Sequence, residues 1–457
     1  MNNKINQQFD QLTQSHPDKT LDAIVFLKAE MEKNDCKFGE DLIPTFLKPF
    51  FLPHATSQNI ANVIHVIIDV LEKVTHLYFT NPELKDFFYI DKKAEELIKM
   101  DHGYSRNVVI SRPDSFFAND ILKFVEFNCD SPAGAGYTDA EENIQKTMFP
   151  FTEIANNFEL YPHHRLDDLL SALLSCYEEF AGKNKKPNIA IVDWNEVRTQ
   201  NEFRILKKHF MSKGYDTTIA DPRELKFSNG KLEHKGFSID LVYRRAIFKE
   251  LMERRDDVQN FLKAYKAGKI CVVNPFRSRL ASTKAILSII TNPKQYRSLF
   301  TEEENHIIQH HVPWTRRVKD IQTNHGNDTV FLRKHIVNHK DHLVLKPSDS
   351  YGGKNVYIGC ETNQNEWDAL VEGIITHQED WVVQRYVQIP QMSVPVVEGN
   401  KISYQTKKIN FNPFVFNGRY AGSVARLSDQ SVINVSAGGG LIPVIEYEER
   451  HKDKKTQ

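Results

Sequence analysis

The chain has 457 residues, 40% of them hydrophobic and 26% charged, which is the composition of an ordinary globular protein with room for two or three domains. Lys and Arg number 59 and Asp and Glu 60, so the formal net charge of -1 gives no general electrostatic reason to expect nucleic acid or an anionic membrane as a partner. The five cysteines are scattered without a C-x-x-C spacing, which argues against a zinc site or a disulfide framework and fits a reducing compartment.

Residues 1–100 are predicted to form a helical N-terminal region. Between residues 60 and 78, apolar side chains recur at the i, i+3, i+4 spacing of an amphipathic helix. Charged residues interrupt that stretch, and the start of the chain lacks an apolar signal segment. We therefore expect a cytoplasmic protein that is neither exported nor inserted in a membrane. No residue in this region indicates chemistry.

Two short polar motifs follow, Arg112-Pro113-Asp114 and Glu126-Phe127-Asn128. The apolar segments VVI and ILKFV before them predict two strands, joined by a turn in SFFAND. Because alternate side chains of a strand share a face, each motif presents its two polar residues on one side. A guanidinium, two carboxylates and an amide gathered in this way suit Mg²⁺ and phosphate. The alternative is an exposed sheet face with ordinary surface charges.

The segment DSPAGAG, residues 130–136, is predicted to be a loop that leads into a helix, with Thr138 and Glu141 at the spacing of a capping box. It is either a packing turn or a loop whose small residues let a substrate approach the backbone closely.

Residues 186–275 are predicted to form a small Rossmann-like parallel α/β unit. The strands IAIVDW, YDTTIAD and IDLVYRR are accompanied by a helix over 201–213. The unit lacks a G-x-G-x-x-G motif, so a dinucleotide role is unsupported. Arg244 and Arg245 follow the third strand, where open α/β sheets tend to bind ligands. One of them is a candidate contact for a phosphate or carboxylate, and a solvated strand end is the alternative.

The segment Ser282-Thr283-Lys284 is predicted to cap and begin a helix. A lysine is electrostatically disfavoured at a helix N-terminus, where the dipole is already positive. An anion there would resolve the conflict, so Lys284 is a candidate phosphate ligand, unless it is simply solvated.

The remaining candidate residues lie in a predicted antiparallel sheet. The strands LVLK, which ends at Lys346, and NVYIG predict a hairpin around the glycine-rich segment 348–354, whose backbone N–H groups, with Lys354, can cradle a triphosphate. The strand WVVQRYV then brings Gln384, Tyr386 and Val387 to a position where a hinge offers hydrogen bonds to an adenine.

Together these motifs resemble the parts of an ATP-grasp ligase. In most ATP-grasp enzymes the metal-binding E-x-N follows the lysine and the glycine loop, whereas here Glu126 precedes Lys346 by more than two hundred residues. This order resembles the circularly permuted ATP-grasp group and is similar to the synthetase domain of glutathionylspermidine synthase, in which R-x-D is followed by E-x-N at the same separation. The resemblance covers roughly residues 100 to 445 and is supported by VYRR, VVNPF and the final GGG.

The resemblance implies an α/β fold of the circularly permuted ATP-grasp type. Residues 101–185 would carry the metal site, and residues 276–457 would form the nucleotide-binding subdomains around the Rossmann-like unit. Residue by residue, it and the patterns above assign catalysis to Arg112 and Arg426; Mg²⁺ to Asp114, Glu126 and Asn128; ATP to Lys284, Lys346, Ser350, Gly352, Gly353, Lys354, Gln384, Tyr386 and Val387; and substrate to Ser131 and Arg244. Ala133 stands where the synthetase has a second serine.

The implied activity is that of an ATP- and Mg²⁺-dependent carboxylate-amine ligase that forms an amide through an acyl phosphate on an amino-acid or peptide-like substrate. Its partners would be a small carboxylate and a small amine, with neither nucleic acid nor membrane. Two alternatives stay open. One is a phosphotransferase that passes phosphate to a histidine, for which His163, His164, His310 and His311 are available; the other is a nucleotide-binding scaffold without catalysis.

Overall fold

The computed structural model describes residues 3–326, 328–398, 401–435 and 438–450. At the centre of these described residues lies a mixed sheet of eight strands. Six of them follow the order β3-β23-β22-β21-β4-β5, while β20 pairs with β21 and β6 pairs with β23. β23 and β3 are parallel and the other pairs are antiparallel. The strands are β3 (Phe50–Pro53), β4 (Ile110–Ala118), β5 (Ile121–Asn128), β6 (Phe158–Tyr161), β20 (Gln391–Glu398), β21 (Lys401–Phe416), β22 (Arg419–Ser428) and β23 (Gly440–Glu449).

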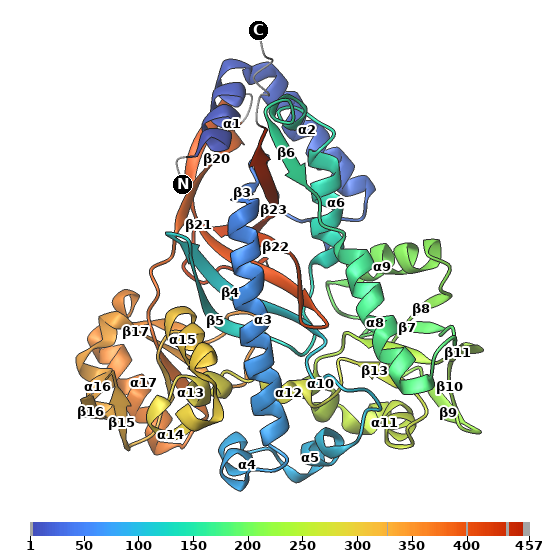
Figure 1. Cartoon of the computed structure of the whole chain (residues 1–457), viewed down its shortest axis with the longest axis vertical. Helices are drawn as coiled ribbons and strands as arrows, with labels where there is room; N and C mark the ends of the chain where they lie inside the picture. The colour runs from blue at the N-terminus through green and yellow to red at the C-terminus, as the bar shows by residue number, and fades with distance from the viewer. Residues whose placement is uncertain (1–2, 327, 399–400, 436–437, 451–457) are drawn as a thin grey trace.

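The long helix α3 (His54–Leu77) lies across this sheet (Figure 1). Its buried face, which includes Ile60, Ile64 and Ile67, belongs to the same apolar cluster as Phe411 of β21. The predicted amphipathic helix is therefore confirmed. The other helices of the first 185 residues are α1 (Lys4–Ser15), α2 (Pro17–Lys33), α4 (Pro82–Phe88), α5 (Lys92–Lys99), α6 (Ala135–Gln145), α7 (Phe151–Ile154) and α8 (Arg165–Ala181). Of these, α4 and α5 lie at the lower end of α3 (Figure 1).

The first hundred residues also contain strands, which the prediction of a helical region did not anticipate. β1 (Lys37–Phe38) and β2 (Asp41–Leu42) form a small hairpin. β3, whose first three residues are buried, pairs with β23 near the other end of the chain. The proposed region 1–100 thus contributes a strand to the central sheet as well as helices.

The predicted parallel α/β unit is present as one of two lower lobes (Figure 1). Its sheet has the order β13-β12-β7-β8, with all pairs parallel. A three-stranded antiparallel sheet, β11-β10-β9, lies beside it. The elements are β7 (Ile189–Val192), α9 (Gln200–Ser212), β8 (Thr217–Ala220), β9 (Lys226–Ser228), β10 (Lys231–His234), β11 (Phe237–Ile239), β12 (Leu241–Arg244), α10 (Phe248–Glu253), η1 (Arg255–Val258), α11 (Gln259–Lys266) and β13 (Cys271–Val273).

The second lower lobe contains the antiparallel sheet β14-β19-β17-β18 and the hairpin of β15 and β16. Its elements, with those that lead into it, are α12 (Ser278–Ser282), α13 (Ala285–Ile290), α14 (Pro293–Tyr296), η2 (Arg297–Leu299), α15 (Glu302–His311), β14 (Thr315–Arg317), β15 (Gln322–His325), β16 (Asp328–Phe331), α16 (Leu332–Asn338), η3 (Lys340–His342), β17 (Leu343–Pro347), β18 (Tyr357–Ile358), η4 (Gly359–Glu361), α17 (Gln364–Thr376) and β19 (Trp381–Arg385). The hairpin predicted around the glycine-rich segment is the pair β17 and β18.

Three local predictions need correction. β4 continues through SFFA, and the turn is Asn119-Asp120, both with positive φ as a tight hairpin requires. Thr138 and Glu141 lie inside α6, which begins after Gly134 at φ +111, so they do not form a capping box. Ser282 ends α12, and Lys284 is the residue that precedes α13.

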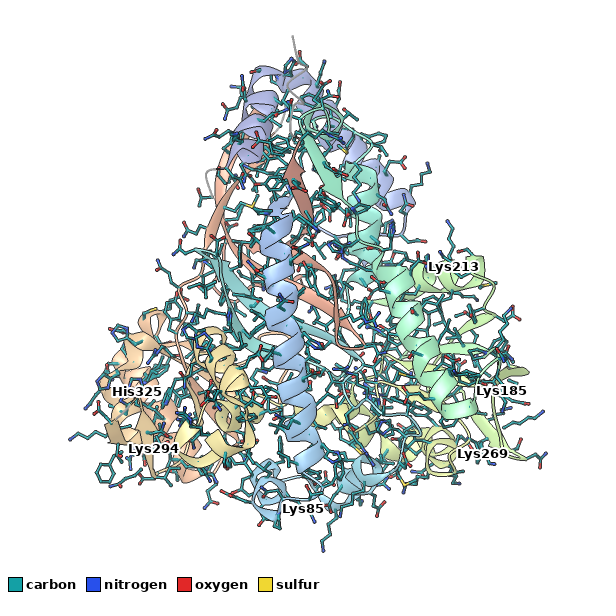
Figure 2. All side chains as sticks on the ribbon, viewed as in Figure 1. Lys85, Lys185, Lys213, Lys269, Lys294 and His325 are labelled. Atoms are coloured by element: carbon teal, nitrogen blue, oxygen red, sulfur yellow. The ribbon has the colours of Figure 1, made fainter. Side chains whose placement is uncertain are left out.

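Charged side chains are spread over separate parts of the molecule. Figure 2 labels Lys85, Lys185, Lys213, Lys269 and Lys294 around its periphery. Among the described residues, no helix combines the length and hydropathy that a membrane span requires.

Candidate active site

The two polar motifs lie opposite each other on the hairpin of β4 and β5. Arg112 pairs with Asn128 and Asp114 with Glu126 in the strand register, with a bulge directly after Asp114. All four side chains line one cleft. The prediction that they share a face is therefore confirmed, and the register explains why: residues two apart on each of two paired strands form a compact square.

The carboxylates of this square are neutralised by cations from distant parts of the chain. Asp114 accepts a hydrogen bond from Nη2 of Arg426 at 2.7 Å and one from Nδ2 of Asn128 at 3.0 Å. Burial by itself raises the pKa of Asp114, but Arg426 and Arg112 outweigh it and hold this pKa below its usual value. Glu126 is 2.9 Å from Nζ of Lys284. Both carboxylates are thus held beside positive charge.

Within the square, Arg112 is the residue that contacts the loop following β5. Burial and the neighbouring Arg426 lower its pKa to about 10, so it stays positive at neutral pH. Its Nη1 donates to the backbone oxygen of Ala133, and its Nη2 is 3.9 Å from Asp114. The orientation of Arg112 therefore depends on where the loop holds Ala133.

Asp114, Glu126 and Asn128 offer two carboxylates and an amide oxygen, a donor set that suits Mg²⁺ when phosphate oxygens and water complete the shell. The amide oxygen is available because Asn128 uses its Nδ2 to donate to Asp114 and to the backbone oxygen of Arg112. Among the residues that the structure describes, no group of three or more His, Cys, Asp or Glu side chains is arranged to hold a metal. The set that includes an amide is therefore the candidate metal site.

Two lysines approach the square from the second lobe. Lys284 is 3% exposed, and its Nζ also donates to the backbone oxygen of Ser350 at 2.6 Å. Lys346 at the end of β17 donates to Oε1 of Gln384 at 2.8 Å. Burial lowers the pKa of Lys346 to about 8, and the nearby charge of Lys284 acts in the same direction.

The cleft has an empty volume of about 1000 Å³, and the residues of the predicted adenine hinge line it. These hinge residues are Gln384, Tyr386 and Val387, and apolar residues that include Val344 and Ile358 line the same cleft. Gln384 is fixed by a hydrogen bond to Thr315, and the backbone N–H of Tyr386 already donates to the oxygen of His342.

The glycine-rich segment 348–354 closes one side of the cleft. Gly352 and Gly353 line it with φ of +73 and +71, and a Cβ on Gly353 would collide with the side chain of Val432. Gly352 is therefore favoured by its positive φ alone, and Gly353 by its positive φ and by the close approach of Val432. Lys354, by contrast, is exposed, with Nζ 5.7 Å from the centre of the Tyr351 ring, and it does not line the cleft.

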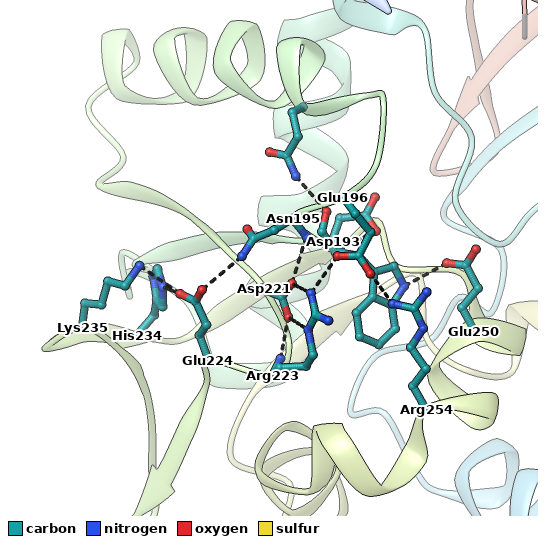
Figure 3. A network of polar contacts seen from close by, with 12 residues as sticks. Asp193, Asn195, Glu196, Asp221, Arg223, Glu224, His234, Lys235, Glu250 and Arg254 are labelled. Carbon is teal, nitrogen blue, oxygen red and sulfur yellow. Dashed lines mark hydrogen bonds and ion pairs between the residues drawn. The ribbon is translucent and has the colours of Figure 1, made fainter. Parts of the chain in front are cut away.

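Three contacts tie this segment to the rest of the protein. Ser348 bonds with Thr283 at 3.0 Å, Asp349 with Arg279 at 2.6 Å, and the hydroxyl of Tyr351 donates to Glu250 at 2.8 Å. Figure 3 shows Glu250 at the end of a polar network at the carboxyl edge of the parallel sheet. The glycine-rich segment therefore bridges the two lower lobes.

A second cavity, with an empty volume of about 810 Å³, also borders the square. It shares Arg112, Glu126, Asn128 and Gly352 with the first cleft. Ser131 and Ser350 line this second cavity, and the hydroxyl of Ser131 donates to the backbone oxygen of Arg245. Two cavities that share residues of the candidate metal site can hold two reactants next to each other.

Arg244 ends β12 as predicted, but its side chain does not reach a ligand cavity. Its side chain is fully buried, and Nη2 is 2.6 Å from Asp130. Its other donors bond to the backbone oxygens of Asn274 and Ala246. Arg244 lines neither cavity, so it fixes the base of the loop instead of meeting a ligand.

Sequence reasoning also missed Glu202, on α9. Its Oε1 accepts hydrogen bonds from the backbone N–H groups of Gly134 at 2.6 Å and Gly136 at 3.3 Å. Arg245, 3.6 Å from the same carboxylate, donates to the backbone oxygen of Pro132. This buried pair holds the loop that orients Arg112. A charged residue in an amphipathic helix gives no sequence signal for such a role.

Comparisons with known proteins agree with this architecture. An uncharacterized protein from Synechocystis sp. is 21% identical over 69% of this chain and 64% of its own length, and one from Mycobacterium tuberculosis is 21% identical over 70% and 56%. The chain thus spans less than two thirds of these curated relatives. The structure of a glutathione synthetase-like effector from Globodera pallida has a TM-score of 0.62 at 14% identity, covering 93% of this chain and 96% of that one, so the two share a fold. A family model described as circularly permuted ATP-grasp type 2 matches residues 118–428, and the chain therefore belongs to that family.

Proposed function

We propose that this protein is an ATP- and Mg²⁺-dependent ligase that joins a carboxylate to an amine through an acyl phosphate. The observation that carries the proposal is the meeting of two cavities at Arg112, Glu126 and Asn128. An enzyme that phosphorylates an acid needs the terminal phosphate of ATP and the acid on opposite sides of one set of charge-neutralising groups.

ATP would occupy the first cleft. Its adenine would lie between the apolar walls at the hinge residues Gln384 to Val387, and its phosphates would extend toward Lys346 and Lys284. Both lysines are buried. Nζ of Lys284 is 2.9 Å from Glu126, and Lys346 is near enough to the square for the charges of Glu126 and Asp114 to act on its pKa. The glycine-rich segment would cover the phosphates and keep water from them.

Asp114, Glu126 and Asn128 would hold Mg²⁺, which when bound would neutralise charge on the phosphate oxygens. Arg426 and Lys284 hold the two carboxylates in place before it binds, through ion pairs of 2.7 Å to Asp114 and 2.9 Å to Glu126. Arg112 faces both cavities, so its guanidinium can orient the acid and stay with the phosphoryl group as charge moves toward it.

In the first step a carboxylate oxygen attacks the terminal phosphorus while the bond to ADP breaks. The amine then attacks the acyl carbon, the bond to phosphate breaks and the amine gives up a proton, leaving amide, ADP and phosphate. The protein's part is to align the reactants and to place fixed positive charge.

The phosphotransferase alternative finds less support in the geometry. His163 lies with Nε2 2.5 Å from Glu446, and His310 and His311 bond to backbone oxygens of His306 and Leu122. Neither these histidines nor His164 line either cavity.

The proposal is tested by incubating the protein with Mg·ATP and a panel of amino acids, small peptides and polyamines, and measuring nucleotide products together with the mass of the coupled product. ADP and phosphate should appear only when an acid and an amine are both present. Lys346→Ala should slow their release by about 10²–10³, whereas Lys263→Ala, at an exposed position on α11, should not. AMP and pyrophosphate as products would contradict it, and tight Mg·ATP binding without any turnover would favour a scaffold.

A further inference from the structure

The second cavity has an unbalanced set of charges. Six charged side chains line it: Arg112, Glu126, Asp130, Lys249, Arg279 and Asp349. Three of them are carboxylates and three are cations, so the lining looks neutral. The balance changes once each carboxylate is matched to the cation that lies nearest to it.

Each carboxylate of the lining already has a close partner. Asp130 is 2.6 Å from Arg244 and Glu126 is 2.9 Å from Lys284, and both of these cations lie outside the lining. Asp349 is 2.6 Å from Arg279, which belongs to the lining.

Two cations of the lining are left without a close carboxylate. Arg112 reaches Asp114 only at 3.9 Å, and Asp114 is more closely bound to Arg426 at 2.7 Å. Lys249, on α10, forms no ion pair with any residue that the structure describes, and its Nζ only donates to the backbone oxygen of Asp349 at 3.4 Å. A ligand that complements this cavity therefore carries two negative charges.

We infer that the acid accepted by the second cavity is a small dianion, with its reacting carboxylate at Arg112 and a second carboxylate at Lys249. This inference rests on the proposed function for the identity of the reacting group. The rest of the lining suits such a ligand, because Ser131, Ser282 and Ser350 supply polar groups while the apolar side chains are few.

Lys249 is a specificity residue in this scheme. It lies on a different element from Arg112 and is only half-buried, so an acid without a second carboxylate could still reach Arg112. Such an acid would leave the ammonium of Lys249 without a partner in a partly desolvated site, which lowers its affinity.

The test uses carbon-matched acids: malonate, succinate, glutarate and adipate against propionate, butyrate, valerate and hexanoate. Binding is measured by calorimetry with ADP and Mg²⁺ present, so that it does not depend on turnover. At least one dicarboxylate should bind about tenfold more tightly than its matched monocarboxylate, as one charge-assisted contact provides. Lys249→Gln should reduce that ratio to about one, Lys249→Arg should keep it, and Lys263→Gln on the neighbouring helix should leave it unchanged.

A second arm measures release of ADP with each acid and hydroxylamine as the trapping amine. Selective binding that depends on Lys249, without ADP release, would uphold the dianion site and contradict the ligase. ADP release with equal preference for both acid series, or a preference that survives in Lys249→Gln, would uphold the ligase and overturn the dianion site. Equal binding of the two series to the wild-type protein would overturn it as well.

Discussion

Lys346 makes nucleotide affinity depend on pH in a way that can be calculated. Its pKa of about 8 in the free protein results first from burial, with Lys284 lowering it further while Glu126 and Asp114 oppose this. If only the charged lysine binds phosphate, the binding-competent fraction is about nine tenths at pH 7 and about one tenth at pH 9. Affinity for ADP should therefore fall about tenfold over this range, equivalent to about 1.4 kcal/mol.

The sign follows from the protonation states. Raising the pH through the pKa of Lys346 removes the positive charge that the phosphates need, whereas the terminal phosphate of ADP, with a pKa of roughly 6, is already ionised throughout. Calorimetric titrations with ADP and EDTA at pH 7, 8 and 9 measure the effect in the metal-free protein. Lys346→Gln should bind weakly with a flat profile, and Lys263→Gln should follow the wild type. A wild-type affinity that is constant over this range, or a tenfold loss that persists in Lys346→Gln, would refute the reasoning.

Three further outcomes are expected. Glu126→Gln and Asn128→Ala should keep the wild-type circular dichroism spectrum but lose Mg²⁺-dependent ADP release; near wild-type rates would remove both from the metal set. Glu202→Ala leaves two buried N–H groups without an acceptor, so it should lower the free energy of unfolding by about 1–3 kcal/mol and reduce kcat more than nucleotide affinity. Glu202→Gln should restore both the stability and kcat; equal losses in the two variants would point to the charge of Glu202 instead of its anchoring of the loop. Tyr351→Phe removes the bond to Glu250, so limited proteolysis should cut residues 348–354 faster than in the wild type unless Mg·ATP is added; unchanged cleavage would mean that this bond does not hold the segment.

The local part of the site could be predicted because strand geometry is simple. Alternation of side chains fixes which of Arg112, Asp114, Glu126 and Asn128 share a face, and hairpin pairing then brings the two strands together. The same holds for the glycine-rich turn between β17 and β18. These features depend on residues near each other in sequence.

The long-range part could not be predicted, because no periodicity reports it. Arg426 reaches Asp114 across a sequence separation of 312 residues, and β3 joins the sheet through β23. For Arg244 the sequence pattern predicted a contact that the structure does not show. An arginine at a strand end suggests a ligand contact, but Arg244 is buried and pairs with Asp130 at 2.6 Å. Only the fold decides whether a charge meets a ligand or another side chain.

The central claim is that the acid is phosphorylated, and isotope transfer tests it most directly. A carboxylate labelled with ¹⁸O in both oxygens is supplied with Mg·ATP and an amine, and the released phosphate is analysed by mass spectrometry. The account predicts one ¹⁸O atom in each phosphate, because the carboxylate oxygen that attacks phosphorus leaves with it. Unlabelled phosphate, or label found in AMP, would contradict the account.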